Sequence, residues 1–269
     1  MHFNPYNLIE FYVGEITGTT PQTVSIYTDS NNSIPIQVSE GNKWYTYVLP
    51  KNKGLDMVEG DSVKKVVVKA DINTNGNTII PDYTVEASFK GSNTSKVTNM
   101  DTMFYGCSGL TSLDLRYFNT SNVTDMNYMF YNCNSLTSLD LSSFDTSKVN
   151  SMISMFDKCS SLTSLDLRYF NTSNVTDMDS MFYDCSSLTS LYLRNFNTSK
   201  VNSMDRMFYG CSKLETLDLS GWNTSNVTSM GNMFDGCTSL TSIRMIGCEQ
   251  PTIDKIAAVK PSSANIETT

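Results

Sequence analysis

The chain has 269 residues, of which 39% are hydrophobic and 17% charged, and its formal net charge is −8. This length accommodates two domains. No region is basic, which excludes nucleic-acid binding driven by phosphate contacts and disfavours attraction to an anionic membrane. Ser, Thr and Asn supply most of the polarity, and these residues favour turns and strands over long helices.

Residues 1–92 contain no repeat and are predicted to form a small β domain. Short segments alternate apolar and polar residues and are separated by turn clusters, which indicates a half-buried antiparallel sheet. We expect a sandwich-like or barrel-like domain that serves for attachment, docking or oligomerisation and covers the first repeat. The predicted strands span residues 8–13, 24–27, 34–38, 44–49, 63–69 and 84–89.

Residues 93–248 form six repeats of 26 residues. Each repeat carries Val, then Met, then Met-Phe, then Cys, then Leu-x-x-Leu-x-Leu. A period of this length predicts a solenoid, in which every repeat packs only against its neighbours. The cysteines mark the period without a slip: Cys107, Cys133, Cys159, Cys185, Cys211 and Cys237.

A strand and a short helical segment are predicted within each repeat. Residues 113–115 alternate, so Leu113 and Leu115 are expected to point inward and the residues between and beside them outward. Residues 100–107 carry apolar side chains at spacings of 3, 4 and 7, which indicates one face of a helix. That helix, or 3₁₀ turn, is too short to form without packing.

The cysteines are expected to act as buried thiols. Stacked repeats would place them roughly 5 Å apart, but parallel side chains do not point at one another as a disulfide requires. No CxxC motif or histidine cluster indicates a metal site, and no cofactor is expected. Residues 249–269 break the frame and are predicted to cap the last repeat with a helix over 251–259 and a strand over 264–268.

The motif Met-Phe-x-x-Cys-x-x-Leu-x-x-Leu-x-Leu, with Asn-Thr-Ser-x-Val before the next Met, resembles the BspA-type leucine-rich-repeat proteins, a bacterial surface family. The resemblance covers residues 93–248. It implies an irregular leucine-rich solenoid, surface display and adhesion to host or neighbouring cells. It supplies no catalytic residues.

The outward strand face is the first candidate site. The aspartates at equivalent positions of successive repeats form a column, here called the aspartate column, in which stacked carboxylates would repel one another. Arginines two residues further along the chain can offset this repulsion. The structural interpretation is therefore a self-neutralising solvated face. The functional interpretation is a flat polar surface for a glycan or a protein, since a guanidinium matches a carboxylate. We look for specificity at the departures from consensus, Tyr192 and Arg194. The candidate residues are Asp114, Arg116, Asp140, Asp166, Arg168, Tyr192, Arg194 and Asp218.

An aromatic column after the Met-Phe pairs is a second candidate face, because exposed tyrosines are enriched in recognition surfaces. Its alternative role is to cover the turn and pack against neighbouring repeats. Its members are Tyr105, Tyr131, Tyr183 and Tyr209, and Asp157 and Asp235 interrupt it.

Asp71, Asn73, Asn75 and Asp82 are spaced like the ligands of a calcium loop, although Asn75-Gly76 is also a hairpin signal and a strand precedes the segment. The hairpin is the favoured interpretation. No enzymatic motif is present, and the single histidine, His2, lies at the terminus.

We therefore predict a non-enzymatic adhesion or recognition protein that is cell-surface, secreted or part of a virion. Its partner would be a glycan or protein on a host or neighbouring cell, with no nucleic acid. The N-terminus lacks a charged segment followed by an apolar run, so no signal peptide is visible in this chain, and no apolar stretch is long enough for membrane insertion. The alternative is a structural component of a virion or surface appendage, with residues 1–92 docked to the assembly.

Overall fold

A computed structural model describes residues 94, 95 and 97–269 in full, together with the backbone of seven preceding strands. These strands are β1 (Tyr6–Ile16), β2 (Gln22–Asp29), β3 (Asn32–Val38), β4 (Lys43–Pro50), β5 (Leu55–Met57), β6 (Val63–Ala70) and β7 (Glu86–Ser88). The chain is rich in strand and poor in helix, as its Ser-, Thr- and Asn-rich composition predicts.

The first strands pair in two sheets. β1 pairs antiparallel with β4 and β6, and β2 pairs antiparallel with β3 and β5. Both sheets are open in the strand orders recorded for the described residues, so the predicted barrel alternative is wrong. The six predicted strands are present, β5 was not predicted, and the predicted hairpin over 71–82 lies outside the described residues.

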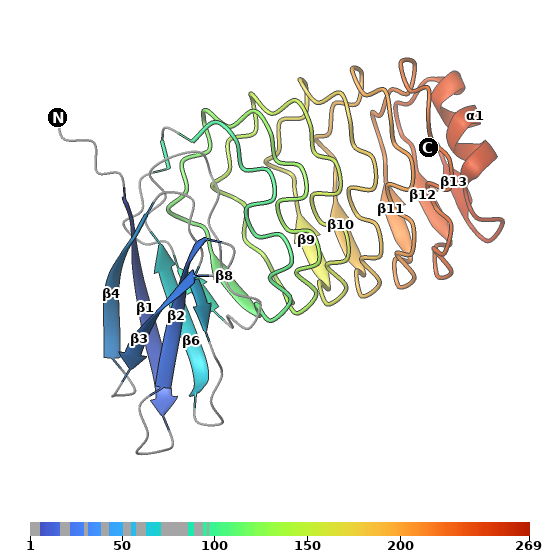
Figure 1. The fold of residues 1–269 in the computed structure, drawn as a ribbon. Helices are drawn as coiled ribbons and strands as arrows, with labels where there is room; N and C mark the ends of the chain where they lie inside the picture. The colour runs from blue at the N-terminus through green and yellow to red at the C-terminus, as the bar shows by residue number, and fades with distance from the viewer. Residues whose placement is uncertain are drawn as a thin grey trace.

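The N-terminal sheet continues into the repeats. β7 pairs parallel with β6 and with β8 (Ser112–Asp114), in the sheet order β4-β1-β6-β7-β8. Glu86 faces Ser112, one repeat length later, so β7 already occupies the strand position of a repeat. Backbone hydrogen bonds therefore cross the boundary predicted at residue 92, and the two parts share one sheet (Figure 1).

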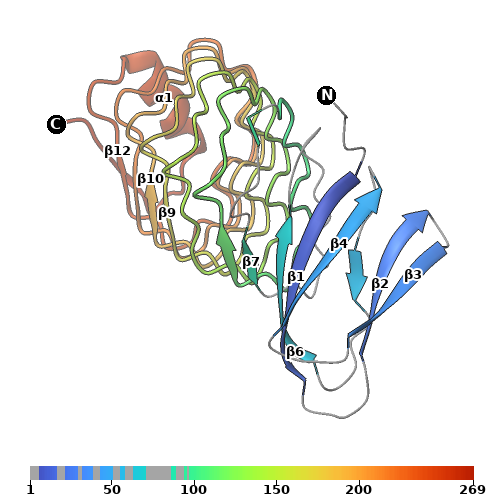
Figure 2. The same cartoon turned by 90° about the vertical axis from the view of Figure 1, so that its left-hand side faces the viewer.

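Successive repeats stack in parallel (Figure 1), and the coils lie one behind another when viewed from the N-terminal side (Figure 2). The strands of this stack are β8, β9 (Ser164–Asp166), β10 (Ser190–Tyr192), β11 (Thr216–Asp218) and β12 (Ser242–Arg244). The second repeat forms no strand at residues 138–140, where Leu139 is only partly buried. A second parallel ladder links Asn99, Asp125, Ser151, Asp177, Ser203 and Ser229.

Of the helix or 3₁₀ turn predicted for residues 100–107, the helix is wrong, because this segment is a run of tandem turns, here called the arc of each repeat. Alternate N–H groups bond three residues back, as Cys107 N–H does to the Phe104 carbonyl. The N–H groups between them donate to the next repeat, as Phe104 N–H does to the Met129 carbonyl at 2.8 Å. A helix would use all of these donors within one repeat, whereas the arc shares them between repeats.

The arc still buries the predicted apolar residues, including Met100, Phe104 and Cys107. The Phe rings of the arcs stack from repeat to repeat, with 5.5 Å between the centroids of Phe104 and Phe130. The cysteines of the frame are buried thiols, and Cys159 Sγ donates to the Phe130 carbonyl at 3.1 Å. Burial raises the pKa of the Cys237 thiol to about 12, which keeps it protonated and unreactive at neutral pH.

The C-terminal cap follows the prediction. Helix α1 (Gln250–Val259) begins next to Pro251, and β13 (Asn265–Glu267) adds in parallel to β12. Thr252 and Ile256 of α1 are buried against the last repeat, and Lys255 Nζ donates to the carbonyls of Thr224 and Val227. The cap covers the core and the strand edge of the sixth repeat.

Candidate functional site: the exposed strand face

Strands β8 to β11, the equivalent segment 138–140 of the second repeat and the turns after them carry the predicted recognition residues at equivalent positions of successive repeats. The register pairs Tyr192 with Asp166, so these side chains are neighbours on one face. Every predicted residue of the face is at least partly exposed, while Leu113, Leu165 and Leu191 between them are buried. The inside and outside assignments made from the alternating pattern are therefore confirmed.

Three arginines lie two residues beyond the aspartate position, and two of them are paired within their own repeat. Arg116 donates to both carboxylate oxygens of Asp114 at 2.9 Å, and Arg168 holds Asp166 in the same way with a shortest distance of 2.7 Å. These hydrogen bonds lower the pKa of both aspartates. The charges of these pairs cancel locally, as the structural interpretation of the face requires.

The remaining aspartates of the aspartate column accept hydrogen bonds from backbone N–H groups. Asp140 Oδ1 accepts the N–H of Ser142 at 3.0 Å, and Asp218 Oδ1 accepts the N–H of Ser220 at 3.0 Å. Hydrogen bonds from Ser142 lower the pKa of Asp140. The aspartate column thus fixes the turn after each strand position, which is a structural role common to Asp at such positions.

Arg194 is the exception among these three arginines, and Arg244 of β12 likewise makes no ion pair with a described residue. Tyr192 occupies the position at which Asp114 and Asp166 hold their arginines, and Arg194 makes no ion pair with any residue that the structure describes. The Arg194 guanidinium is exposed and retains its full set of donors. Tyr192 itself is 50% exposed, and the Arg168 guanidinium lies 5.5 Å from the centroid of its ring.

Further exposed tyrosines follow the strand positions. Tyr169 is 63% exposed and Tyr117 is 43% exposed. Exposed aromatic rings beside guanidinium groups form a surface that offers flat apolar contact and charged hydrogen bonds together. Tyr169, Tyr192 and Arg194 place this combination in the middle of the stack.

The second predicted face, the aromatic column, is largely occupied by its own stacking. Tyr105 stacks on Tyr131 with centroids 4.5 Å apart, and Tyr183 stacks on Tyr209 at 4.7 Å. Only Tyr105 of this column is more than partly exposed. These rings mainly cover the arcs and pack against neighbouring repeats.

Asp157 and Lys158 fill the gap between the two tyrosine stacks. Lys158 Nζ donates to the Tyr131 hydroxyl at 2.7 Å and lies 4.9 Å from the centroid of that ring and 5.9 Å from the Tyr183 ring. Asp157 is 7% exposed, and its Oδ1 has no hydrogen-bond partner. Desolvation raises the pKa of Asp157 to about 6, and Lys158 opposes that shift. The sequence showed that Asp157 interrupts the aromatic column, but the burial of its side chain was not predicted. The adjacent Lys158 could have indicated that burial.

The calcium candidate formed by Asp71, Asn73, Asn75 and Asp82 lies outside the described residues. Within the described part of the chain, no group of three or more His, Cys, Asp or Glu residues is arranged to hold a metal ion. In the same part, none of the helices has the length and apolar character needed to cross a membrane.

A comparison with protein families matches the chain twice to the family described as "Mycoplasma protein of unknown function, DUF285", over residues 77–167 and over residues 162–245. The two matches together span 77–245, which is more than half of the 269 residues. The chain belongs to the DUF285 family. A search of curated proteins and a search of solved structures find no match.

The two DUF285 matches follow one another along the stack and include β7 to β12. The first match begins at residue 77, before the first predicted repeat and before β7. The family assignment therefore agrees with the continuous sheet in placing β7 with the repeats.

Proposed function

We propose that this DUF285 protein is a non-enzymatic surface recognition protein. Its repeats form a leucine-rich solenoid of the BspA type, and the exposed strand face binds a cell-surface glycan or protein. The observation that carries the proposal is Arg194, a guanidinium without a carboxylate partner at a repeat position where the other two arginines, Arg116 and Arg168, are paired. An unpaired guanidinium beside an exposed tyrosine suits a ligand that presents a carboxylate.

Two residues close to Arg194 in the sequence, Tyr192 and Asn195, support a binding site at the same place. Tyr192 offers an exposed ring next to Arg168, and Asn195 Nδ2 donates to the Arg168 carbonyl at 2.8 Å, which joins the two neighbouring turns. A rigid surface loses little conformational entropy when a ligand binds. The sheet shared with the N-terminal strands supports a role of that domain in attachment, because it couples the two parts through backbone hydrogen bonds.

The test is binding of labelled full-length protein to bacterial cells, epithelial cells, mucin and matrix proteins. Two variants target the site: Arg194→Ala removes the guanidinium, and Tyr192→Asp gives Arg194 the carboxylate partner that Arg116 has. Arg116→Ala is the matched control, since it removes an exposed arginine that is already paired. We expect both site variants to weaken saturable binding at least about tenfold and the control to change it little.

If all three variants reduce saturable binding to the same extent, the binding site does not depend on Arg194 in particular, and its assignment to Arg194 is wrong. If the protein binds none of the surfaces in the panel, the recognition proposal is overturned. The structural role in a virion or appendage would then be the better account, because the shared sheet makes the N-terminal strands and the repeats one continuous unit.

A further inference from the structure

The sixth repeat leaves one row of backbone donors without acceptors. In each of the first five repeats, four N–H groups at every second residue of the arc donate to carbonyls of the next repeat. In the fifth repeat, for example, Phe208 N–H donates to the Met233 carbonyl at 2.9 Å and Gly210 N–H to the Asp235 carbonyl at 2.8 Å. The pattern repeats at every internal interface of the stack.

The equivalent donors of the sixth repeat belong to Met230, Asn232, Phe234 and Gly236. None of these four N–H groups has a hydrogen-bond partner among the residues that the structure describes. The cap covers the strand edge through β13 and the core through α1, but it supplies no acceptor to this arc. Asn232 and Gly236 are exposed there, as an open edge requires.

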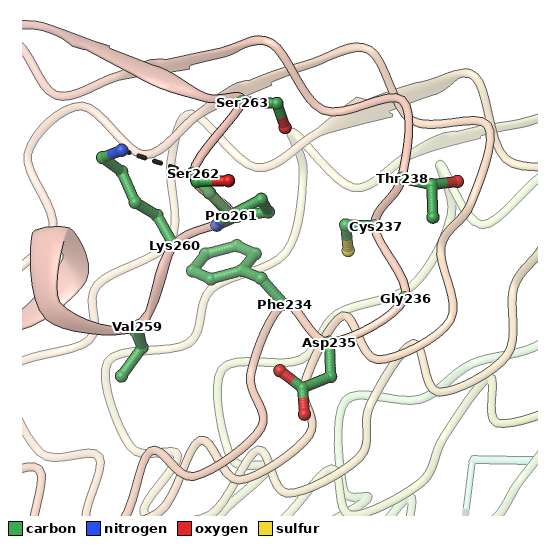
Figure 3. Close-up of a pocket in the computed structure, with 10 residues that line it drawn as sticks. All are labelled: Phe234, Asp235, Gly236, Cys237, Thr238, Val259, Lys260, Pro261, Ser262 and Ser263. Carbon is green, nitrogen blue, oxygen red and sulfur yellow. Dashed lines mark hydrogen bonds between the residues drawn. The ribbon is translucent and has the colours of Figure 1, made fainter.

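A cavity of about 270 Å³ that is largely open to solvent lies beside this row of donors, between the arc and the segment that follows α1 (Figure 3). Phe234 and Cys237 line it from the arc, and Val259 and Pro261 line it from the cap. The cavity is large enough for one aliphatic or aromatic side chain, and Phe234 and Gly236 belong both to its lining and to the donor row.

We propose that this end of the stack binds an extended segment of another polypeptide. The segment adds to the arc where a seventh repeat would lie. Its backbone carbonyls accept from the four N–H groups, and one apolar side chain enters the cavity. An extended chain presents carbonyls along one edge at every second residue, and the donors of this row likewise belong to every second residue of the arc. Affinity from the backbone and selectivity from a pocket are the two elements of recognition by strand addition.

The charges near the row disfavour an anionic small ligand. Asp235 lies on the arc and lines the cavity, and it would repel a phosphate or a carboxylate. Lys260 also lines the cavity, but its Nζ already donates to the carbonyls of Pro261 and Ala264, at 3.3 and 2.5 Å. Neutral carbonyl groups are therefore the acceptors that fit this edge.

The probe for this site is a displayed library of random linear peptides, selected on immobilised full-length protein. The blocking variant is Ser262→Trp, since Ser262 is exposed and lines the cavity. Ser225→Trp is the matched control, an exposed serine of the sixth repeat outside the lining. Selected peptides should share one apolar position, bind the control like the wild type and lose at least about tenfold in affinity for Ser262→Trp.

Amide hydrogen exchange on the wild-type protein gives a readout that does not depend on a variant. A bound peptide should slow exchange at Asn232, Phe234 and Gly236, while the arc of the third repeat should not change. Replacing a contacting carbonyl of the peptide by a methylene group should weaken binding, because it removes an acceptor. A library that yields no binder, binding unaffected by Ser262→Trp, or unchanged exchange at these amides would each overturn the proposal.

Discussion

Asp157 is a carboxylate that destabilises the fold at neutral pH, and Asp157→Asn should relieve this effect. The side chain is 7% exposed, and its Oδ1 has no partner. Its carboxyl group titrates near 3.8 in the unfolded chain and at about 6 in the folded one, a difference of about 2 pKa units that corresponds to about 3 kcal/mol.

The direction in which stability changes with pH depends on which state, folded or unfolded, binds more protons. Between these two pKa values the folded state holds more protons than the unfolded state, so the stability falls as the pH rises. The penalty is absent below the unfolded pKa and complete above the folded one. Asn keeps the size of the side chain without its charge, so Asp157→Asn should raise the free energy of unfolding by about 2–3 kcal/mol at about pH 7.5 and by much less at about pH 4.

Urea unfolding of full-length wild type and variant at several pH values measures this difference directly. Asp235→Asn is the matched control, because Asp235 occupies the equivalent position of the sixth repeat but is exposed. The control should change stability little at any pH. A gain for Asp157→Asn that does not depend on pH, or a loss of stability at neutral pH, would refute the assignment of Asp157 as a desolvated carboxylate.

Three substitutions test the packing and hydrogen bonding of the repeats by urea or thermal unfolding. Phe156→Ala should cost about 3–5 kcal/mol, because it opens a cavity in a ring column where the centroids of Phe156 and Phe182 are 5.7 Å apart. Asp140→Ala should cost only about 0.5–1 kcal/mol, since it removes one exposed hydrogen bond to Ser142, and equal costs for these two variants would contradict the inside and outside assignments. Thr172→Val should cost about 1–3 kcal/mol, because the buried Thr172 hydroxyl accepts the N–H of Asn197 at 2.8 Å and donates to the carbonyl of the same residue at 3.1 Å. Exposed Thr163→Val is the control for Thr172→Val, and equal effects would remove the special role of the buried threonine.

The repeat length and the alternating strand pattern were sufficient to predict which apolar residues of the stack are buried. Leu113 and Leu115 point inward because alternation in a strand allows only two faces. The tandem turns of the arc were not predicted, because inward residues at spacings of 3, 4 and 7 suit a helix equally well. The N–H groups decide between the two structures, and the sequence does not show where they donate.

One signal for the arc was nevertheless present. Each arc contains two residues with positive φ, such as Thr102 and Gly106 in the first repeat. The Gly106 position holds Gly, Asn, Lys, Asp, Gly and Gly in successive repeats, which is the composition of a left-handed position. The Thr102 position carries no such bias, and there the N–H groups of Thr102 and Tyr128 donate to carbonyls of the next repeat. A helix is incompatible with both positions.

The repeated polar residues are largely satisfied by one another, and this directs the search for partners to the departures from the repeat. Asp114 is paired with Arg116, Asp140 and Asp218 hold backbone N–H groups, and Thr172 holds Asn197. Such residues gain little from a ligand, because binding would first break an existing hydrogen bond. A partner gains most where the repeat is interrupted.

Two interruptions meet that condition. Tyr192 occupies the position where an aspartate would pair with Arg194. At the arc that contains Phe234 the stack ends, so the N–H donors of this arc have no carbonyl acceptors in a following repeat. The first exposes a charged side chain on the strand face, and the second exposes neutral backbone donors at the end of the stack. The two sites should therefore respond differently to salt, since screening weakens an exposed ionic contact and leaves hydrogen bonds to neutral carbonyls largely unchanged.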